Sequence, residues 1–301
     1  SAACPSRCRG GGGRSMSERH NVPPRAARWA SEGERSRFAD LDKAPFPAFE
    51  PGTVWLAGAG PGAAGLLTLM AAHGLMQADV VIHDALVGAD VLALARGARL
   101  IHAGKRGGKP SAVQADICER LVAEAKAGHR VLRLKGGDPF MFGRGGEECE
   151  ALLREGVAYR IVPGISAGLG GVAYAGIPVT HRSTNQSVTF LTGHDLTGAL
   201  PAAIEWDRLA GASPVLVMYM ATKHLAAIAT RLLTAGRGAN EAVAVIANAT
   251  LPEQEVVRLT LAEAAVPRPL PTPAVIVLGA VVPFAERFAW FDAAKSAGLM
   301  G

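Results

Sequence analysis

Short apolar segments alternate with segments of helical pattern along most of the chain, and this alternation limits the fold more than any other feature. The helical pattern at 111–127, for example, begins with Ser111 as a capping residue and ends before Gly128. Such alternation predicts an α/β fold with a mostly parallel sheet that is covered by helices on both faces. The apolar segments expected to form this sheet are 53–57, 79–84, 99–103, 130–134 and 159–162.

A second unit of the same kind begins after residue 182, where the pattern pauses. A Pro-rich link follows one of its apolar segments, which favours a mixed sheet with antiparallel members. The chain of 301 residues is long enough for two domains. We therefore predict an N-terminal α/β domain at 51–182 and a C-terminal α/β domain at 183–301. The second domain's expected strands are 187–191, 214–220, 242–247, 256–261 and 274–278, and its expected helices are 223–234 and 284–294.

Residues 1–50 do not share this pattern. They contain Gly10–Gly13, many arginines and scattered prolines without apolar periodicity, a composition typical of disordered segments. We expect them to form a disordered N-terminal extension, in which Met16 is a candidate natural start. No apolar core follows the arginines, which argues against a secretory signal.

The formal charge of +5 and the pI near 9.2 indicate an anionic partner. Aromatic residues make up only 5% of the chain and no helical pattern is basic along its length, which argues against nucleic acid and favours a small polyanion. No apolar run is long enough to cross a bilayer, and no His, Cys or Asp spacing is typical of a metal site. Cysteines without paired spacing predict reduced thiols and a cytoplasmic setting; these are Cys4, Cys8, Cys118 and Cys149.

The run from Arg133 to Glu148 has the sequence RLKGGDPFMFGRGGEE and links an expected strand to an expected helix. Open α/β sheets bind ligands at loops of this kind, which lie at the carboxyl edge of the sheet. Gly136 and Gly137 allow backbone N–H groups to come close to a ligand, and Asp138 offers an acceptor that the following proline holds in place. A chain reversal alone needs neither this length nor so many charges, so we interpret the run as a binding loop.

An earlier glycine-rich loop leaves two interpretations open. Gly58, Gly60 and Ala63 fit the dinucleotide fingerprint, and Asp84 ends the following strand at a suitable distance. These features favour a nicotinamide or flavin enzyme. Against this, Pro61 removes a donor that a pyrophosphate would use, and the binding loop described above would be left without a role. A tight turn between strand and helix explains the loop equally well.

Further motifs accompany these two loops along the chain. They are Gly58–Gly62 with Leu66–Thr68, Asp84, Gly104–Arg106, Pro163–Ala167 and Thr180–Arg182. Together with the run from Arg133 to Glu148, they resemble the tetrapyrrole methylase family, in order and with ordinary spacing, over about 53–282. The long run is specific enough to make chance agreement remote.

The resemblance implies methyl transfer from S-adenosylmethionine to ring carbons of a tetrapyrrole polycarboxylate, with S-adenosylhomocysteine as product. It is nearest to family members that act on uroporphyrinogen III, so two successive transfers, at ring positions 2 and 7, would give precorrin-2 for sirohaem and cobalamin synthesis. The family fold has two α/β domains with the cofactor in the cleft between them, usually in a homodimer. The resemblance implies no nucleic acid, membrane or metal.

The family's functional positions carry over residue by residue. Asp84 and Lys105 match the proposed proton acceptor and donor. Ser166 stands where relatives often have Thr, which keeps the hydroxyl, and Ala249 stands where many have Gly, which puts close packing there in doubt. The cofactor positions fall on Pro61, Gly136, Gly137, Asp138, Met141, Ser166, Ala167, Met220 and Ala249.

Elementary chemistry agrees with these roles and leaves alternatives open. A sulfonium already activates its methyl group, so the protein mainly aligns donor and acceptor, and carbon methylation then requires a proton to be lost or moved. Asp84 could accept that proton, end a turn, or form a plain salt bridge with Lys105. A polycarboxylate substrate favours basic loop residues; the candidates are Arg106, Lys109, Arg144, His181 and Arg182.

Three classes of function therefore stay open. We favour the tetrapyrrole methylase, because the pair of Asp84 and Lys105 and the run at 140–148 fit it. The second is another enzyme of the same fold, acting on a later precorrin or on a different substrate. The third is a nicotinamide enzyme or a non-catalytic basic binding module. Met141 and Met220 would suit an adenine or a thioether, although methionine more often packs in a core.

Overall fold

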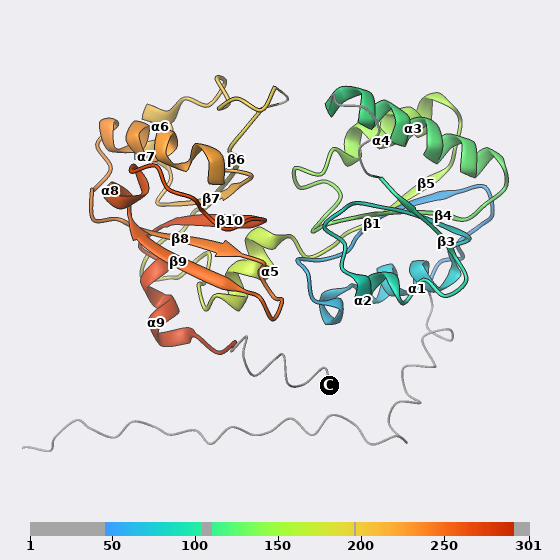
Figure 1. Cartoon of the computed structure of the whole chain (residues 1–301), viewed down its shortest axis with the longest axis horizontal. Helices are drawn as coiled ribbons and strands as arrows, with labels where there is room; N and C mark the ends of the chain where they lie inside the picture. The colour runs from blue at the N-terminus through green and yellow to red at the C-terminus, as the bar shows by residue number, and fades with distance from the viewer. Residues whose placement is uncertain (1–45, 104–109, 196, 292–301) are drawn as a thin grey trace, which may run out of the picture. The chain divides into compact units, whose positions relative to one another are not determined.

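The computed structural model describes residues 46–103, 110–195 and 197–291. The first half of this part forms a sheet of parallel strands in the order β3-β2-β4-β1-β5 (Figure 1). The chain moves to one side of β1, returns to β4 and continues to β5 on the other side. The carboxyl ends of β1 and β4 therefore lie at a topological switch point, where open α/β sheets bind ligands. The strands are β1 Val54–Gly58, β2 Val80–His83, β3 Arg99–His102, β4 Val131–Lys135 and β5 Tyr159–Val162.

Helices cover both faces of this parallel sheet, as predicted (Figure 1). Every residue of β1 and β4 is buried, which explains the continuous apolar sequence of β1, whereas β4 also buries two charged side chains, Arg133 and Lys135. Trp55 and Leu132 pack toward α1 and α2, whereas Val54 and Val131 pack toward α3 and α4, because successive strand residues point to opposite faces. The covering helices are α1 Leu69–Gln77, α2 Ala89–Leu92, α3 Pro110–Lys126 and α4 Gly145–Arg154, with a short 3₁₀ turn at Ala64–Leu66.

The packed chain begins before the expected boundary at residue 50. Phe49 is 2% exposed and stacks on Trp55 with ring centroids 4.5 Å apart, and Phe46 lies 4.7 Å from the ring of His73. Two phenylalanines carry too little periodicity to predict a packed segment. Residues 46–50 therefore do not belong to a disordered extension, and residues 1–45 lie outside the described part of the chain.

The second half forms another sheet, in the order β6-β7-β10-β8-β9 (Figure 1). Strands β6 and β7 are parallel, whereas β10 runs antiparallel to β7 and β8, and β8 runs antiparallel to β9. This confirms the prediction of a mixed sheet with antiparallel members. The strands are β6 Thr189–Thr192, β7 Val215–Tyr219, β8 Ala242–Ala247, β9 Glu255–Thr260 and β10 Ala274–Gly279.

Helices also cover both faces of the mixed sheet. One core joins it to α6, α7 and α8, and a second core joins it to α5 and to the segment around α9. α8 begins with a capping box between Thr260 and Glu263. α9 ends at Phe288, which makes the expected helix 284–294 too long. The elements are α5 Ala167–Tyr174, α6 Trp206–Ala212, α7 Leu225–Thr234, α8 Leu261–Ala264 and α9 Ala285–Phe288, with 3₁₀ turns at Thr222–His224 and Val282–Phe284.

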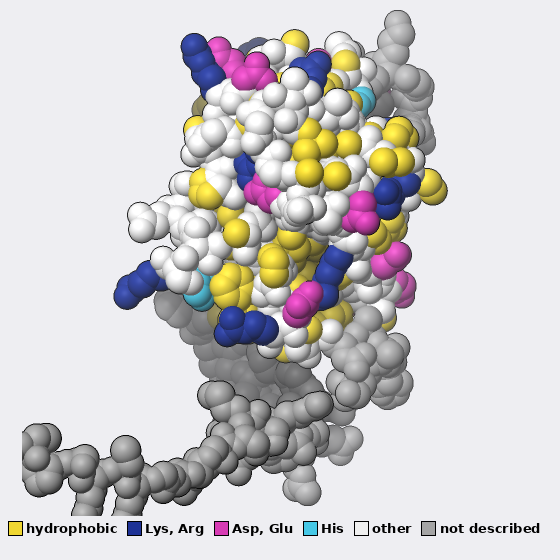
Figure 2. Space-filling model, turned by 90° about the vertical axis from the view of Figure 1, so that its left-hand side faces the viewer, with side chains coloured by type: hydrophobic (Ala, Val, Ile, Leu, Met, Phe, Trp, Pro, Cys, Tyr) yellow, Lys and Arg dark blue, Asp and Glu magenta, His cyan; other side chains and the backbone are white. Residues whose placement is uncertain are grey.

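The surface over the second half mixes side chains of different kinds. Figure 2 shows the face that lies to the left in Figure 1, where Lys and Arg side chains are scattered rather than gathered. No helix among the described residues is long and apolar enough to cross a membrane. The described residues also hold no cluster of His, Cys, Asp or Glu suited to a metal ion.

The cysteines of the described part are free, as predicted. Cys149 is buried and Cys118 is half-buried, and burial raises the pKa of both thiols, with Glu148 adding to the effect. A raised pKa keeps a thiol protonated and unreactive. Cys4 and Cys8 lie outside the described residues.

Candidate active site

Three glycine-containing loops meet at the carboxyl edge of the parallel sheet. Gly58 ends β1, Gly137 follows β4 and Gly164 follows β5. A Cβ at Gly164 would stand 2.7 Å from Cα of Gly58, and the carbonyl oxygen of Gly137 would be nearer still. Gly60 and Gly137 exchange backbone hydrogen bonds of 2.7 and 3.2 Å, and both have a positive φ that favours glycine. The glycine motifs are therefore needed for a close junction of three loops, which we call the glycine junction.

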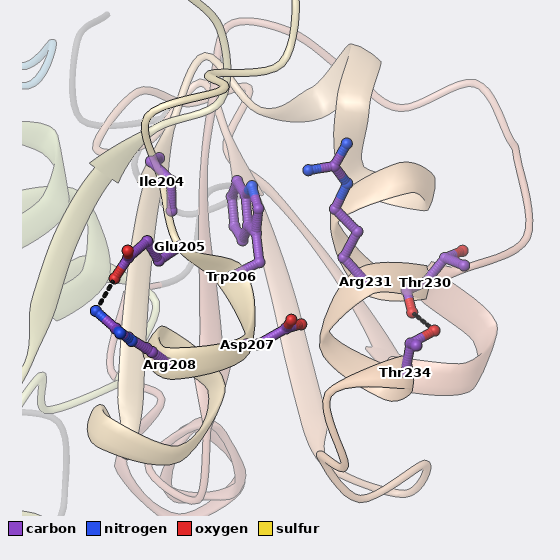
Figure 3. Close-up of a pocket in the computed structure, with 8 residues that line it drawn as sticks. All are labelled: Ile204, Glu205, Trp206, Asp207, Arg208, Thr230, Arg231 and Thr234. Carbon is purple, nitrogen blue, oxygen red and sulfur yellow. Dashed lines mark hydrogen bonds and ion pairs between the residues drawn. The ribbon is translucent and has the colours of Figure 1, made fainter.

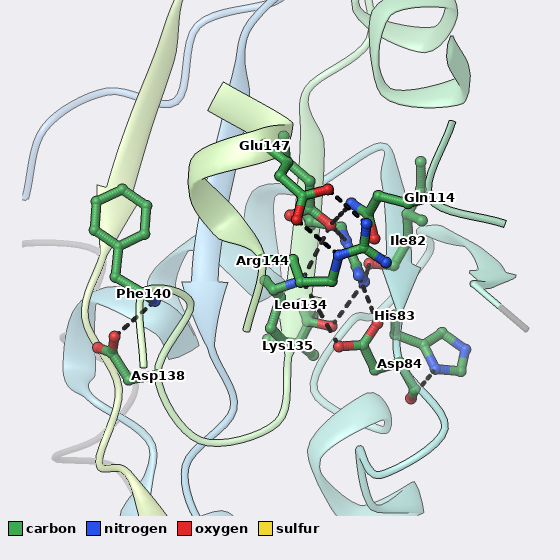
Figure 4. A network of polar contacts seen from close by, with 12 residues as sticks. Ile82, His83, Asp84, Gln114, Leu134, Lys135, Asp138, Phe140, Arg144 and Glu147 are labelled. Atoms are coloured by element: carbon green, nitrogen blue, oxygen red, sulfur yellow. Dashed lines mark hydrogen bonds and ion pairs between the residues drawn. The ribbon is translucent and has the colours of Figure 1, made fainter. Parts of the chain in front are cut away.

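Asp138 fastens the glycine junction through its carboxylate. Oδ2 accepts a hydrogen bond from the backbone N–H of Gly164 (3.0 Å), and Oδ1 accepts one from Phe140 (2.8 Å; Figure 4). Hydrogen bonds to an ionised acceptor are stronger than those between neutral groups. Asp138 thus ties the loop after β4 to the loop after β5. Its oxygens have further lone pairs, so it can still accept a hydrogen bond from a ligand.

Ser166 and Tyr219 connect this edge with the second sheet. Oγ of Ser166 lies 2.6 Å from Oη of Tyr219, which also accepts from the backbone N–H of Gly168 (2.8 Å). Burial raises the pKa of Tyr219 and outweighs the opposite effect of these hydrogen bonds, so the phenol stays protonated. Because Oη already accepts from Gly168, its own O–H is available to donate to Ser166.

Ala249 packs closely against two glycines, Gly62 in the loop after β1 and Gly171 in α5. A Cβ at Gly171 of α5 would stand 2.7 Å from Cβ of Ala249, and one at Gly62 would stand 2.9 Å from the carbonyl oxygen of Ala249. The backbone N–H of Ala63 donates to Oγ1 of Thr250 (2.9 Å). The extra methyl group of Ala249, which raised doubt about packing, is therefore accommodated because the facing residue on α5 is a glycine.

The other predicted cofactor positions lie around the same junction. A Cβ at Gly170 would stand 3.1 Å from the ring of Pro61, and a Cβ at Gly137 would stand 3.8 Å from the backbone nitrogen of Ala167. The backbone N–H of Met141 donates to the carbonyl oxygen of Asp138 (3.4 Å).

Met220 follows β7 directly and is 42% exposed, so it does not pack in the core, whereas Met218 of β7 is fully buried. The backbone of Met220 has a positive φ of 53°. Strained backbone of this kind is often found at functional sites.

A network of buried charges lies beside this edge, between the sheet and helices α3 and α4 (Figure 4). Arg133 and Lys135 are two residues apart in β4 and are 1% and 3% exposed. Oε1 of Glu148, which is fully buried, accepts from Nε of Arg133 (2.9 Å) and from Nζ of Lys135 (3.0 Å). Nε2 of Gln114 donates to the same oxygen (3.2 Å). On the other side, Nη2 of Arg133 donates to Oδ1 of Asp84 (2.5 Å), and Nζ of Lys135 lies 3.9 Å from Oδ2.

The two cations of this network differ in how firmly they hold their protons. Burial alone would lower the pKa of Arg133, but the carboxylates of Glu148 and Asp84 together outweigh it and raise the pKa. Burial lowers the pKa of Lys135, and repulsion from Arg133 adds to this, more than the carboxylates raise it. Arg133 is therefore a permanent cation, whereas Lys135 releases its proton more readily than an ordinary lysine.

The predicted catalytic and substrate-binding residues are only partly described. Lys105, Arg106 and Lys109 lie outside the described residues. Asp84 directly follows β2, as expected, and its described ion-pair partners are Arg133 and Lys135.

Arg144, just before α4, pairs with Glu147 through hydrogen bonds of 2.8 and 2.6 Å. His181 packs on Phe284 with ring centroids 4.3 Å apart, and Arg182 is exposed. Within the described part of the chain, no ion pair or hydrogen bond joins Arg144 to His181 or Arg182.

Sequence reasoning missed the roles of Arg133, Lys135, Glu148 and Tyr219. Arg133 was already in the expected strand 130–134, whereas Lys135 was assigned to the charged run that follows it, although both belong to β4. None of the three was expected to be part of a buried ion network. The available signal was the pair of cations at positions i and i+2 inside an otherwise apolar strand, which places both on one buried face. Tyr219 gave no signal, because an aromatic residue at the end of a strand is common.

A surface hollow of about 520 Å³ lies in the second half of the chain (Figure 3). The residues that line it belong to α6, to α7 and to the segment before α6, and none is a predicted site residue. Nε1 of Trp206, one of these residues, is buried without a hydrogen-bond partner among the described residues. The hollow is separate from the glycine junction in its residues, and we assign it no part in the candidate site.

The fold and the junction define a class: an α/β protein in which a parallel sheet with glycine loops at its switch point is followed by a mixed sheet. The chain belongs to the tetrapyrrole (corrin/porphyrin) methylase family, whose model matches residues 53–265. It is 58% identical over 254 residues to a uroporphyrinogen-III C-methyltransferase of a Sinorhizobium species, which covers 83% of this chain and 91% of that protein. It is 44% identical over 270 residues to siroheme synthase 1 of Klebsiella pneumoniae, which covers 89% of this chain and 56% of that protein. The chain therefore spans about half the length of this siroheme synthase.

Solved structures agree with this membership. A uroporphyrin-III C-methyl transferase from Thermus thermophilus, complexed with S-adenyl homocysteine, matches with a TM-score of 0.67 and 38% identity over 77% of this chain and 99% of that one. The native form of the Thermus thermophilus enzyme matches with the same TM-score and 36% identity, over 76% of this chain and 93% of that one. These matches confirm the predicted tetrapyrrole-methylase-like α/β fold.

Proposed function

We propose that the protein transfers methyl groups from S-adenosylmethionine to uroporphyrinogen III. Two successive transfers, at ring positions 2 and 7, give precorrin-2 for sirohaem and cobalamin synthesis, and S-adenosylhomocysteine is the second product. One observation carries this proposal: the glycine junction and the adjacent Asp84 occur in a chain that is 58% identical to a uroporphyrinogen-III C-methyltransferase over nearly all of that protein.

The residues at the junction are suited to hold S-adenosylmethionine, which supplies an electrophilic methyl group when it is bound. Gly136 and Gly137 let a ligand approach the backbone because they have no side chains. The N–H of Gly137 already donates to Gly60, but its carbonyl oxygen and the carboxylate of Asp138 keep further lone pairs. Ser166 and Ala167 begin α5 beside them. The exposed side chain of Met220 is a flexible apolar surface that can contact an adenine or a thioether. We assign the same binding role to Pro61, Met141 and Ala249.

Asp84 is the proton acceptor in this proposal, and Lys105 is the proton donor. Methylation of a ring carbon requires a proton to leave the macrocycle, and a carboxylate at the carboxyl edge of the sheet can receive it. The side chain of Asp84 is 33% exposed, so one part of it faces the charge network and another part can be reached from outside. The basic residues Arg106, Lys109, Arg144, His181 and Arg182 bind the substrate carboxylates.

We further propose that the cofactor lies between an N-terminal domain at 51–182 and a C-terminal domain at 183–301, and that the protein works in the cytoplasm as a homodimer. The hydrogen bond from the backbone N–H of Ala63 to Oγ1 of Thr250 supports the first point, because it joins the loop after β1 to the segment after β8. The family resemblance supports the proposed cytoplasmic location and the homodimer.

An incubation with uroporphyrinogen III and methyl-labelled S-adenosylmethionine, followed by mass analysis, tests the proposed function. The expected result is a product that carries two labelled methyl groups. Parallel calorimetric titrations with S-adenosylhomocysteine and NAD separate the proposal from the nicotinamide alternative. Binding of NAD together with no binding of S-adenosylhomocysteine would overturn the proposal.

A further inference from the structure

We propose that Arg133 is a positioning residue for Asp84, and that Glu148 and Lys135 hold Arg133 in place for this task. The inference rests on the proposed function, because it takes Asp84 as the proton acceptor. It assigns a role in the reaction to side chains that are buried beneath the site and cannot themselves touch the substrate.

The backbone of Asp84 is fixed by its neighbour strand. Ile82 of β2 pairs in register with Arg133 of β4, and the backbone N–H of Asp84 donates to the carbonyl oxygen of Leu134 (3.1 Å). The carboxylate is then held by Nη2 of Arg133 at Oδ1 (2.5 Å). Because a permanent cation holds Oδ1 at 2.5 Å, whereas Nζ of Lys135 stands 3.9 Å from Oδ2, Oδ2 is the less firmly held oxygen and the one that can receive a proton. Arg133 thus selects both the direction and the reactive oxygen of the carboxylate.

Arg133 is itself unable to move. Its guanidinium is 1% exposed, and each of its nitrogens has a partner. Nε donates to Glu148, whereas Nη1 lies 3.3 and 3.4 Å from the carbonyl oxygens of Ile82 and Leu134. The planar fork of an arginine is therefore locked in one orientation by two strands and by helix α4. A flexible surface arginine could not position a carboxylate in this way.

A purely structural role explains the network less well. A buried ion pair adds little stability, because the loss of hydration offsets the attraction between the charges. Lys135 and Arg133 carry two positive charges, and Glu148 and Asp84 carry two negative ones. Only Asp84 among the four has substantial exposure, 33% of its side chain. Asp84 is therefore the one member of the network that can contact a substrate.

A double-mutant cycle on turnover tests the inference. The variants are Arg133→Gln, Asp84→Asn and the combination of both, in the full chain. We expect Arg133→Gln to lower kcat by about 10- to 100-fold, up to the lower limit of the loss of about 100- to 10,000-fold typical of proton-transfer catalysis, because Asp84 itself remains. The dissociation constant of S-adenosylhomocysteine should not change. In the Asp84→Asn background, the same replacement should have no further effect on kcat. Arg133→Lys, which keeps the charge, should retain more activity than Arg133→Gln.

A matched control is Arg99→Gln, which breaks the pair of the exposed Arg99 on β3 with Glu124 of α3 (2.6 Å) and should leave kcat unchanged. If the effects of Arg133→Gln and Asp84→Asn multiply, Arg133 does not act through Asp84 and the inference is wrong. If Arg133→Gln does not fold, or if Asp84→Asn has no measurable turnover, the Arg133→Lys variant tests the inference instead. Its kcat must then fall without a change in cofactor affinity, and parental turnover would overturn the inference. If the parent protein itself transferred no methyl groups, the proposed function would be wrong, and the inference that rests on it would fail as well.

Discussion

The glycine junction makes a sharp prediction at Gly164. Replacement by alanine would place a Cβ 2.7 Å from Cα of Gly58 and closer still to the carbonyl oxygen of Gly137. Carbon atoms in proteins normally approach to about 3.5–4.0 Å, so the loops would have to separate by about 1 Å. Both neighbours are backbone atoms at the ends of β1 and β4 and cannot rotate away. We therefore expect a loss of about 3 kcal/mol in the free energy of unfolding, at the upper end of the range for overpacking.

The separation would also disturb cofactor binding and turnover. A displacement of about 1 Å at a site can lower turnover by about 100-fold, and Gly137 carries one of the backbone groups assigned to the cofactor. Urea unfolding gives the change in stability, and calorimetric titration with S-adenosylhomocysteine gives the change in affinity. We expect Gly164→Ala to weaken both.

Gly146→Ala is the matched control for this experiment. Gly146 lies in the first turn of α4, and a Cβ there would meet nothing within 4 Å. The replacement should leave affinity unchanged and stabilise the protein by at most about 0.5 kcal/mol, because alanine favours a helix more than glycine does. If Gly164→Ala kept the parent's affinity and lost less than about 1 kcal/mol, the lower limit for overpacking, the close junction would be refuted.

Three further variants test individual residues. Asp84→Ala should lower kcat far more than it weakens binding of S-adenosylhomocysteine, and equal losses in kinetic and calorimetric assays would contradict its role as proton acceptor. Asp138→Ala removes two hydrogen bonds of 2.8 and 3.0 Å from backbone N–H groups. It should therefore weaken cofactor binding and lower the free energy of unfolding by about 3 kcal/mol. Unchanged affinity in calorimetry would count against the loop's role. Arg144→Met breaks only the partly exposed pair with Glu147, so the free energy of unfolding should change by less than about 1 kcal/mol. The KM for the tetrapyrrole should rise. An unchanged KM would show that Arg144 does not bind the substrate.

The strands of both sheets could be predicted from the sequence because buried strands leave short apolar runs. Segments 159–162 and 242–247 coincide with β5 and β8, and the others differ by one or two residues at their ends. Phe46 and Phe49 could not be predicted to pack, because their partners Trp55 and His73 lie in elements that the local pattern does not connect with them.

The loops of the candidate site could be predicted, whereas the charges beneath it could not. Glycine pairs and the Asp-Pro step are local signals, and they indicated a loop at 136–148 without knowledge of its neighbours. The loop is shorter than predicted, because α4 already begins at Gly145. The burial of Arg133 depends on Glu148, fifteen positions later in the chain, and on Asp84, which follows another strand. Spacing along the sequence does not reveal that these side chains meet. A salt bridge between Asp84 and Lys105 was one of the alternatives left open; Lys105 lies outside the described residues, and the described partners of Asp84 are on β4.

The most direct test of the account is a crystal structure of the protein with S-adenosylhomocysteine bound. The account predicts that the ligand contacts backbone groups of Gly136 and Gly137 and the start of α5, with Met220 against its adenine or thioether. A nucleoside bound elsewhere, for example in the hollow beside Trp206, would contradict the assignment of the glycine junction as the cofactor site.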